Sequence, residues 1–107
     1  METNVKKGFY YNFKHNSEKG IFDGAYYVLS TGRHTETGEK TVTTLPLYNK
    51  PDILNRPVDI FLENIESRPE NIIGQKCRFE MIHDKKLISE LIARCQEWYE
   101  EILNPDF

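Results

Sequence analysis

The sequence contains few cysteines, no long apolar run and no surplus of basic residues, and each shortage excludes a class of protein. Its two cysteines, Cys77 and Cys95, lack the spacing of a metal site and indicate no disulfide framework. No window approaches the roughly 20 consecutive apolar residues that span a bilayer, and residues 1–13 lack an apolar core of signal-peptide length. We therefore expect a cytoplasmic protein with no membrane partner and no metal or other cofactor.

The charge balance is acidic, with 17 Asp and Glu against 14 Lys and Arg and a net charge of −3. Nucleic-acid-binding proteins depend on phosphate contacts and normally carry a basic surplus. The balance therefore argues against a nucleic-acid partner, although a local basic patch can still bind a small anion.

Aromatic residues, in contrast, are plentiful: the chain has six Tyr, six Phe and one Trp among 107 residues. Each large ring buries more area than an aliphatic side chain, so a small core is feasible although only 38% of the residues are hydrophobic. A chain of this length has room for one domain, which we expect to span residues 1–107.

Aromatic and β-branched segments predict a mainly β structure. The expected strands are residues 8–13, 25–31, 40–48, 61–66 and 76–82. The second and third form a hairpin whose turn contains Gly38, which is free to adopt positive φ. Pro46 donates no ladder hydrogen bond, which predicts an edge or a bulge beside it. One helical turn is expected at residues 57–61, and loops are expected at 14–24, 48–57 and 67–75, the last with Ile72 and Ile73 packed inward.

A helical pattern begins at Asp84, a residue type that favours helix N-caps. The apolar residues that follow, up to Leu103, fall within an arc of roughly 160°, and charged residues take the opposite arc. Asn104 and Pro105 end the predicted helix. Because the arc is wider than the stripe of an ordinary surface helix, the helix either covers a small barrel alone or also packs on another subunit. We favour a homo-oligomer, since so small a core gains from association.

These elements together predict an α+β, mainly β fold. Residues 8–82 are expected to form a small SH3-like or partly open β barrel, and residues 84–103 a C-terminal amphipathic helix.

Several short motifs follow one another in a particular order: GFYYNFK from Gly8, YYVLSTGRHTETGEKTV from Tyr26, LPLY up to Tyr48, RPVDIF from Arg56, and RF at 78–79. In this order and spacing, residues 8–82 resemble the domain of unknown function 1653 family, a family of small bacterial and phage proteins. The resemblance implies a compact, mainly β domain and no settled activity. The chain departs from the family pattern at Asn12, at Leu54 and in a loop inserted at residues 15–24.

The turn of the predicted hairpin places Arg33, His34, Thr35 and Glu36 side by side, more polar chemistry than a turn needs. One interpretation is structural: Thr35 and Thr37 hydrogen-bond to the turn backbone, and Glu36 faces water. The other is functional. Arg33 offers a planar fork of donors to a phosphate or carboxylate, and His34 offers a donor, an acceptor or a switchable charge. Glu36 then binds a diol or orients His34.

Arg56 is a further candidate, because Pro57 restrains it to an extended backbone that aims a long side chain reproducibly. The alternative is a salt bridge to Asp59 or Glu63. Arg78 is a similar, weaker candidate.

Tyr48 ends the strand that leads from the turn and can stack on a flat ring, a contact worth roughly 1–3 kcal/mol. The alternative for Tyr48 and the other tyrosines is core packing with the hydroxyls at the rim.

Nothing in the sequence completes a catalytic site. Cys77 and Cys95 fall in a predicted strand and on an apolar helix face, where thiols are usually inert. His34 and Glu36 can form a general-base pair, but no nucleophile or metal accompanies them. The three histidines are spaced too widely to predict a metal site.

We therefore predict a protein that is not an enzyme and that binds or sequesters a small anionic or nucleotide-like molecule, as a phage counter-defence protein can do. Its predicted ligand-binding residues are Arg33, His34, Thr35, Glu36, Tyr48 and Arg56. The alternative is a protein-interaction module, in which the apolar arc of the C-terminal helix or the edge near Pro46 contacts a host protein. An enzyme acting on nucleotides or RNA is the third candidate function.

Overall fold

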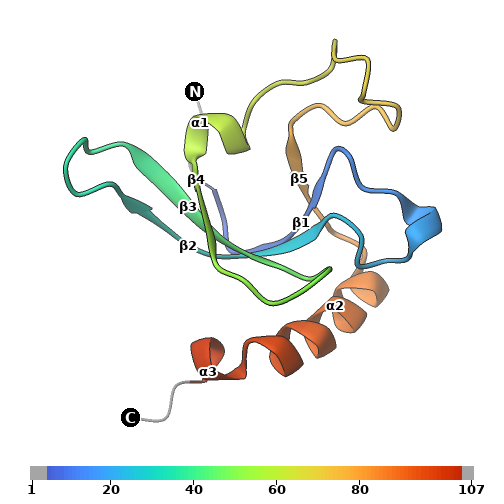
Figure 1. Ribbon diagram of the computed structural model, residues 1–107. Helices are drawn as coiled ribbons and strands as arrows, with labels where there is room; N and C mark the ends of the chain where they lie inside the picture. Colours follow the sequence, from blue (N-terminus) through green and yellow to red (C-terminus); the bar gives the residue numbers. More distant parts are fainter. Residues whose placement is uncertain (1–4, 105–107) are drawn as a thin grey trace.

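Five antiparallel strands form one open sheet in the computed structural model, which describes residues 5–104 (Figure 1). The order across the sheet is β4–β3–β2–β1–β5. The strands are β1 (Gly8–Asn12), β2 (Ala25–Arg33), β3 (Lys40–Pro46), β4 (Leu54–Pro57) and β5 (Phe79–Met81). The helices are η1 (Ser17–Lys19), α1 (Val58–Phe61), α2 (Lys85–Trp98) and α3 (Glu100–Leu103). The mainly β, α+β class is confirmed, but the sheet does not close into a barrel.

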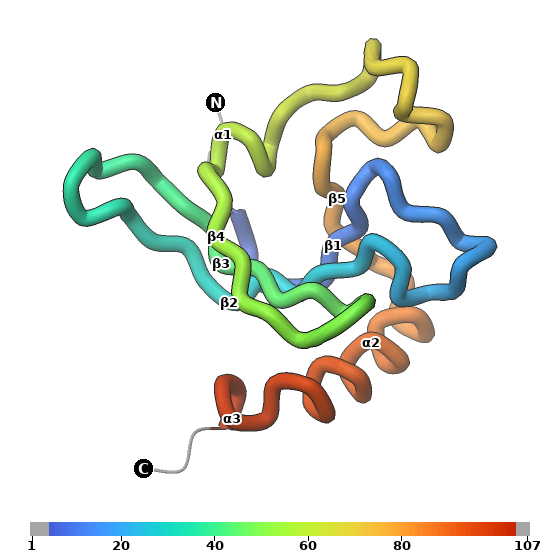
Figure 2. Tube along the Cα trace, in the orientation of Figure 1, coloured from blue at the N-terminus to red at the C-terminus, as the bar shows by residue number. Residues whose placement is uncertain are grey.

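The two faces of the sheet each carry a core. Successive strand residues point to opposite faces, so Phe9 joins one core and Tyr10 the other. The first core packs the sheet against α2, whose Leu91 and Cys95 are buried. The second packs the sheet against α1 and buries Phe61. Figure 2 shows α1 on one side of the curved sheet and α2 running along the other.

The predicted C-terminal helix begins as expected and then breaks. The Asp84 carboxylate accepts the backbone N–H groups of Lys86 and Leu87 at 3.0 and 3.1 Å, which confirms it as the N-cap. The helix does not continue to Leu103 as predicted, because Tyr99 leaves the helical conformation at φ −126° and ψ 28°. The Tyr99 side chain is buried and its hydroxyl is anchored outside the helix, on the β3–β4 loop. Pro105 lies outside the described residues.

Three strand and loop predictions are wrong. Of the residues expected as a strand at 61–66, Phe61 ends α1 and the rest form turns and irregular backbone, with only an isolated bridge from Asn64 to Cys77. Residues 54–57, expected in a loop, form β4. The last strand is shorter than residues 76–82, because the Glu80 carboxylate accepts the N–H groups of Lys76 and Cys77 that a ladder would otherwise use.

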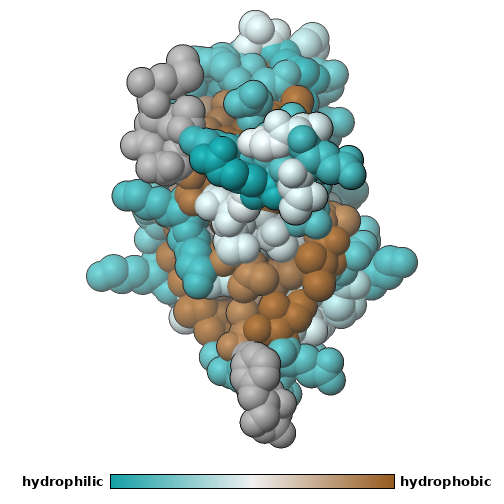
Figure 3. Space-filling model, turned by 90° about the vertical axis from the view of Figure 1, so that its left-hand side faces the viewer, coloured by the Kyte–Doolittle hydropathy of each residue, from teal (hydrophilic) through white to brown (hydrophobic). Residues whose placement is uncertain are grey.

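Some apolar side chains remain exposed. Ile72 is 90% and Ile73 45% exposed, so the prediction that they pack inward is wrong. A continuous apolar patch is also visible in the lower half of the face shown in Figure 3. A hollow of about 260 Å³ lies between the sheet and the C-terminal helices, lined by Phe9, Tyr27, Ile92, Cys95, Gln96 and Leu103.

Candidate functional site

The turn residues that the sequence singles out lie at the exposed end of the β2–β3 hairpin, the arm at upper left in Figure 1. Arg33, His34, Thr35 and Glu36 are all exposed. The Nδ1 atom of His34 accepts the backbone N–H groups of Glu36 and Thr37, at 3.2 and 3.3 Å. The Thr37 hydroxyl accepts one further N–H of the turn at 3.2 Å. His34 and Thr37 therefore stabilise the turn itself.

The other two predicted site residues do not lie at this turn, although the backbone of Arg56 pairs with Val42 on β3, two residues from Lys40, the ladder partner of Arg33. Tyr48 and Arg56 both lie beside Tyr26. The ladder partners of Tyr26 and Arg33 on β3 are six residues apart, Pro46 and Lys40, which corresponds to about 20 Å along a strand. The structure thus brings Tyr48 and Arg56 together and places the four turn residues elsewhere on the sheet. Their assignment as ligand-binding residues stays a prediction.

Arg56 lies on β4 and extends its half-buried side chain over two aromatic rings. Its guanidinium carbon is 5.0 Å from the ring centroid of Phe79 and 5.5 Å from that of Tyr26. Among residues 5–104 it forms no ion pair, so the expected alternatives of Asp59 and Glu63 as partners are wrong. Its Nε is buried and has no hydrogen-bond acceptor. A buried donor without an acceptor costs about 1–3 kcal/mol.

The rings beneath Arg56 are held rigidly. Phe79 is buried and stacks on Phe61 at 4.4 Å with an interplanar angle of 4°. Tyr26 packs edge-on against both Phe79 and Tyr48. We call Arg56, Tyr26, Tyr48 and Phe79 the Arg56 cluster. The sequence predicted neither Tyr26 nor Phe79 as a neighbour of Arg56, although the strand alternation of Tyr26 and the RF motif were available as signals.

A pair of hydroxyls adds polar chemistry to the Arg56 cluster. The Tyr26 and Tyr48 hydroxyls hydrogen-bond to each other. Burial raises the pKa of the Tyr26 phenol, the hydrogen bond to Tyr48 raises that pKa further, and the nearby Arg56 charge opposes both effects. The Tyr26 phenol therefore keeps its proton at physiological pH. Tyr48 is only half-buried, so part of its ring remains open to solvent.

Arg78 is placed differently from Arg56, although it also lies on a ring, with its guanidinium carbon 5.3 Å from the Phe13 centroid. Its Nε and one terminal nitrogen donate to the Glu63 carboxylate at 3.0 and 2.6 Å. Arg68 donates to the other oxygen of that carboxylate at 3.0 Å. The Arg78 hydrogen bonds are the main reason that the pKa of Glu63 lies below its ordinary value. Arg78 is therefore neutralised within the fold.

The family model described as protein of unknown function (DUF1653) matches residues 8–81. The chain belongs to the DUF1653 family. No curated protein and no solved structure gives a significant match to the chain. The match includes Tyr48, Arg56 and Arg78, whereas α2 and α3 lie beyond it.

The loop at residues 15–24 is anchored to β1. The Tyr11 hydroxyl donates to the Ile21 carbonyl at 2.5 Å, and the Tyr11 ring stacks on His15 at 4.2 Å. Gly24 has φ 68° and approaches His15 so closely that an added Cβ would lie 2.6 Å from the His15 Cβ. Tyr11 of β1 therefore fixes this loop.

The reactive side chains of the described residues do not form a catalytic or metal-binding group. Burial raises the pKa of Cys95 to about 11 and is also the main cause of a raised pKa at Cys77. Among residues 5–104, no three His, Cys, Asp or Glu side chains gather closely enough to hold a metal ion. Within the same residues, no helix is both long and apolar enough to cross a bilayer.

Proposed function

We propose that this DUF1653 domain binds a small anionic, nucleotide-like ligand without converting it, and that Arg56 is the residue that recognises the anion. The proposal rests on the surroundings of Arg56. Its guanidinium is stacked on two rings but has no carboxylate partner among residues 5–104, and its buried Nε has no acceptor. A phosphate or carboxylate would supply both the missing charge and the missing acceptor.

The chemistry of the Arg56 cluster suits such a ligand. A guanidinium presents its donors in a planar fork that matches two oxygens of a phosphate or carboxylate. The stack on Phe79 and Tyr26 fixes the plane of that fork before the ligand arrives, which lowers the entropic cost of binding. The half-buried ring of Tyr48 offers a surface for a flat ring such as a base.

The turn residues Arg33, His34, Thr35 and Glu36 join the site only through an extended ligand or a second subunit, because Arg33, where the turn begins, lies about 20 Å from Tyr26 along the sheet. We propose that the protein acts as a homo-oligomer in the cytoplasm and sequesters a signalling nucleotide, as a phage counter-defence protein would. This part of the proposal rests on analogy with other small binding proteins rather than on the fold, since one fold hosts many functions.

Native mass spectrometry of the protein purified from its own cells tests this proposal. We expect a retained small molecule that Arg56→Gln loses, with affinity lowered about tenfold to hundredfold, since hydrogen bonds between charged partners are strong. Arg68→Gln is the matched control, because it removes the same charge at a site already paired with Glu63. Equal retention in both variants, or no mass above that of the chain, contradicts the proposal. If the protein converts any member of a panel of nucleotides and loses this activity when His34 is replaced, the third candidate function, an enzyme acting on nucleotides or RNA, would be supported instead.

A further inference from the structure

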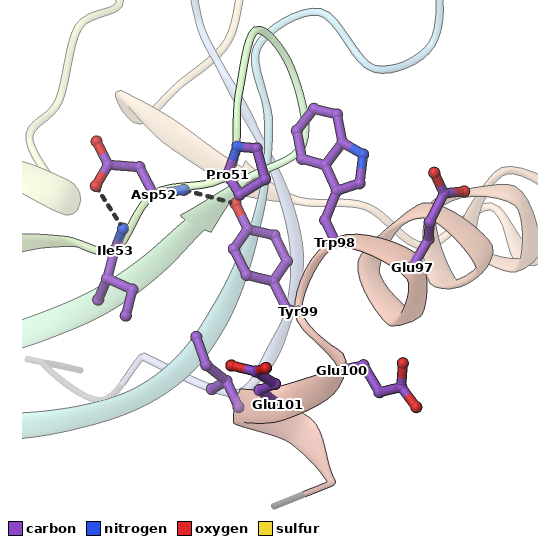
Figure 4. A pocket seen from close by; sticks show the side chains of 9 residues that line it. Pro51, Asp52, Ile53, Glu97, Trp98, Tyr99, Glu100 and Glu101 are labelled. Atoms are coloured by element: carbon purple, nitrogen blue, oxygen red, sulfur yellow. Dashed lines mark hydrogen bonds between the residues drawn. The ribbon is translucent and has the colours of Figure 1, made fainter.

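A pocket of about 570 Å³ opens where α2 ends, between the C-terminal helices and the loop from β3 to β4 (Figure 4). Its lining residues come from two segments, 51–53 and 97–102. The break at Tyr99 builds it. The Tyr99 hydroxyl donates to the Pro46 carbonyl and accepts the Asp52 N–H at 3.2 Å, which fixes the loop against the helix end. The pocket lies on the α2 side of the sheet, away from the Arg56 cluster.

The walls of this pocket present apolar surface to solvent. Trp98, the one tryptophan of the chain, is half-buried. Ile53 is 51% exposed, and Ile102 is half-buried on the opposite wall. These three side chains can pack against the alkyl stem of a long side chain from another molecule, or against an apolar residue next to it.

The charge around the pocket is of one sign. Four of the nine lining residues are acidic, none is basic, and none of the four forms an ion pair within residues 5–104: Asp52, Glu97, Glu100 and Glu101. Figure 4 shows Asp52 on the loop side and the three glutamates on the helix side.

The nearest basic groups leave this charge unbalanced. Arg94 donates to the Leu47 carbonyl at 2.9 Å, and its guanidinium carbon is 3.5 Å from the Phe22 centroid and 4.9 Å from that of Trp98. Lys50 is exposed on the loop and forms no ion pair within the described residues. Neither cation lines the pocket, so its four carboxylates remain available to an incoming cation.

We propose that this pocket docks a lysine or arginine side chain from a segment of a partner protein, with an adjacent apolar residue of that segment on Trp98 and Ile53. The choice of occupant follows from charge complementarity, since opposite potentials steer partners together and exclude acidic ones. Because the walls are apolar, the pocket prefers a basic residue with an apolar neighbour to a free inorganic cation. This interaction surface is independent of anion binding by Arg56.

Fluorescence of Trp98 tests the proposal directly, because no other tryptophan contributes to the signal. The probe is a short, end-blocked peptide in which arginine alternates with leucine, titrated into the full chain. The matched peptide carries citrulline, the neutral isostere of arginine. We expect a saturable change with the arginine peptide, weakened by salt, and a much smaller change with the citrulline peptide.

Matched variants locate the interaction. Glu97→Gln combined with Glu101→Gln removes two pocket charges and is expected to weaken the arginine peptide about fivefold to tenfold. Glu39→Gln combined with Glu90→Gln removes two exposed charges that do not line the pocket, and is expected to change nothing. All four side chains are exposed, so both variants are expected to fold.

Several outcomes would overturn the proposal. One is the absence of a saturable change in Trp98 fluorescence, and another is equal weakening by the two pairs of variants. If a butylguanidinium ion binds as tightly as the peptide, the pocket takes a small cation rather than a protein segment. If the chain is a dimer whose dissociation alone changes Trp98 fluorescence, the occupant is a second copy.

Discussion

Arg56 and Arg78 both lie on aromatic rings, yet only one of them is neutralised within the fold. Arg78 shares the Glu63 carboxylate with Arg68 and so ties the loop after α1 to β5. Arg56 has the same kind of ring beneath it, no ion pair within residues 5–104 and a buried Nε without an acceptor. Stacking on a ring thus fixes the position of a guanidinium in both cases. Whether its charge is neutralised within the molecule or is available to a ligand depends on the presence of a neighbouring carboxylate.

The largest effect is expected from removing the ring beneath Arg56. Phe79 is 2% exposed and contacts Phe61, Tyr26 and Arg56. Phe79→Ala should lower the free energy of unfolding by about 3–5 kcal/mol, because it leaves a cavity at the centre of the core on the α1 side. Urea denaturation measures this loss. Ile72→Ala, at a side chain that is 90% exposed, is the control and should stay within about 0.5 kcal/mol of the parent.

The next effect separates the two arginines themselves. Arg78→Met should clearly lower the melting temperature, because it breaks the hydrogen bonds to Glu63. Arg56→Met should change stability by less than about 1 kcal/mol in either direction, because it keeps the stacking stem and removes an unsatisfied donor. Thermal denaturation of both variants measures the difference. Equal destabilisation would show that Arg56 has a structural role like that of Arg78.

A smaller effect is expected from the hydroxyl pair beside Arg56. Tyr48→Phe removes the hydrogen-bond partner of the buried Tyr26 hydroxyl and should lower the free energy of unfolding by about 1 kcal/mol. The matched control is Tyr27→Phe, since the Tyr27 hydroxyl makes no hydrogen bond within residues 5–104 and its loss should cost little. Chemical denaturation of the two variants gives the comparison. A neutral Tyr48→Phe would mean that the pair contributes nothing to stability.

The smallest expected effect is a pH dependence of stability that arises from the ion pair between Arg78 and Glu63. The pKa of Glu63 in the folded chain lies below its ordinary value of 4.5, chiefly through the Arg78 hydrogen bonds. A carboxyl group with a lowered pKa contributes stability above the unfolded pKa and loses it as pH falls through the folded one. Stability of the parent should therefore fall more steeply below pH 4.5 than that of Arg78→Met. Denaturation curves over this pH window test it, and parallel slopes would contradict it.

Local elements follow from the order of residues in the chain. The β-branched and aromatic residues of 25–31, the turn around Gly38 and the N-cap Asp84 each act over a few neighbouring residues, and the structure contains all three. The motifs from Gly8 to Phe79 likewise identified the family, because their order is a property of the chain alone.

Contacts between these elements depend instead on how the whole chain packs. The sequence grouped Arg56 with the hairpin turn, but side-chain packing turned it toward Tyr26 and Phe79 instead. The break at Tyr99 could not be predicted from the sequence either, because the apolar pattern of the helix continues to Leu103. The break depends on hydrogen bonds between the Tyr99 hydroxyl and the distant residues Pro46 and Asp52. Helical and strand periodicity depend on sequence neighbours, whereas the partner of a guanidinium or a phenol is chosen by residues far away in the chain.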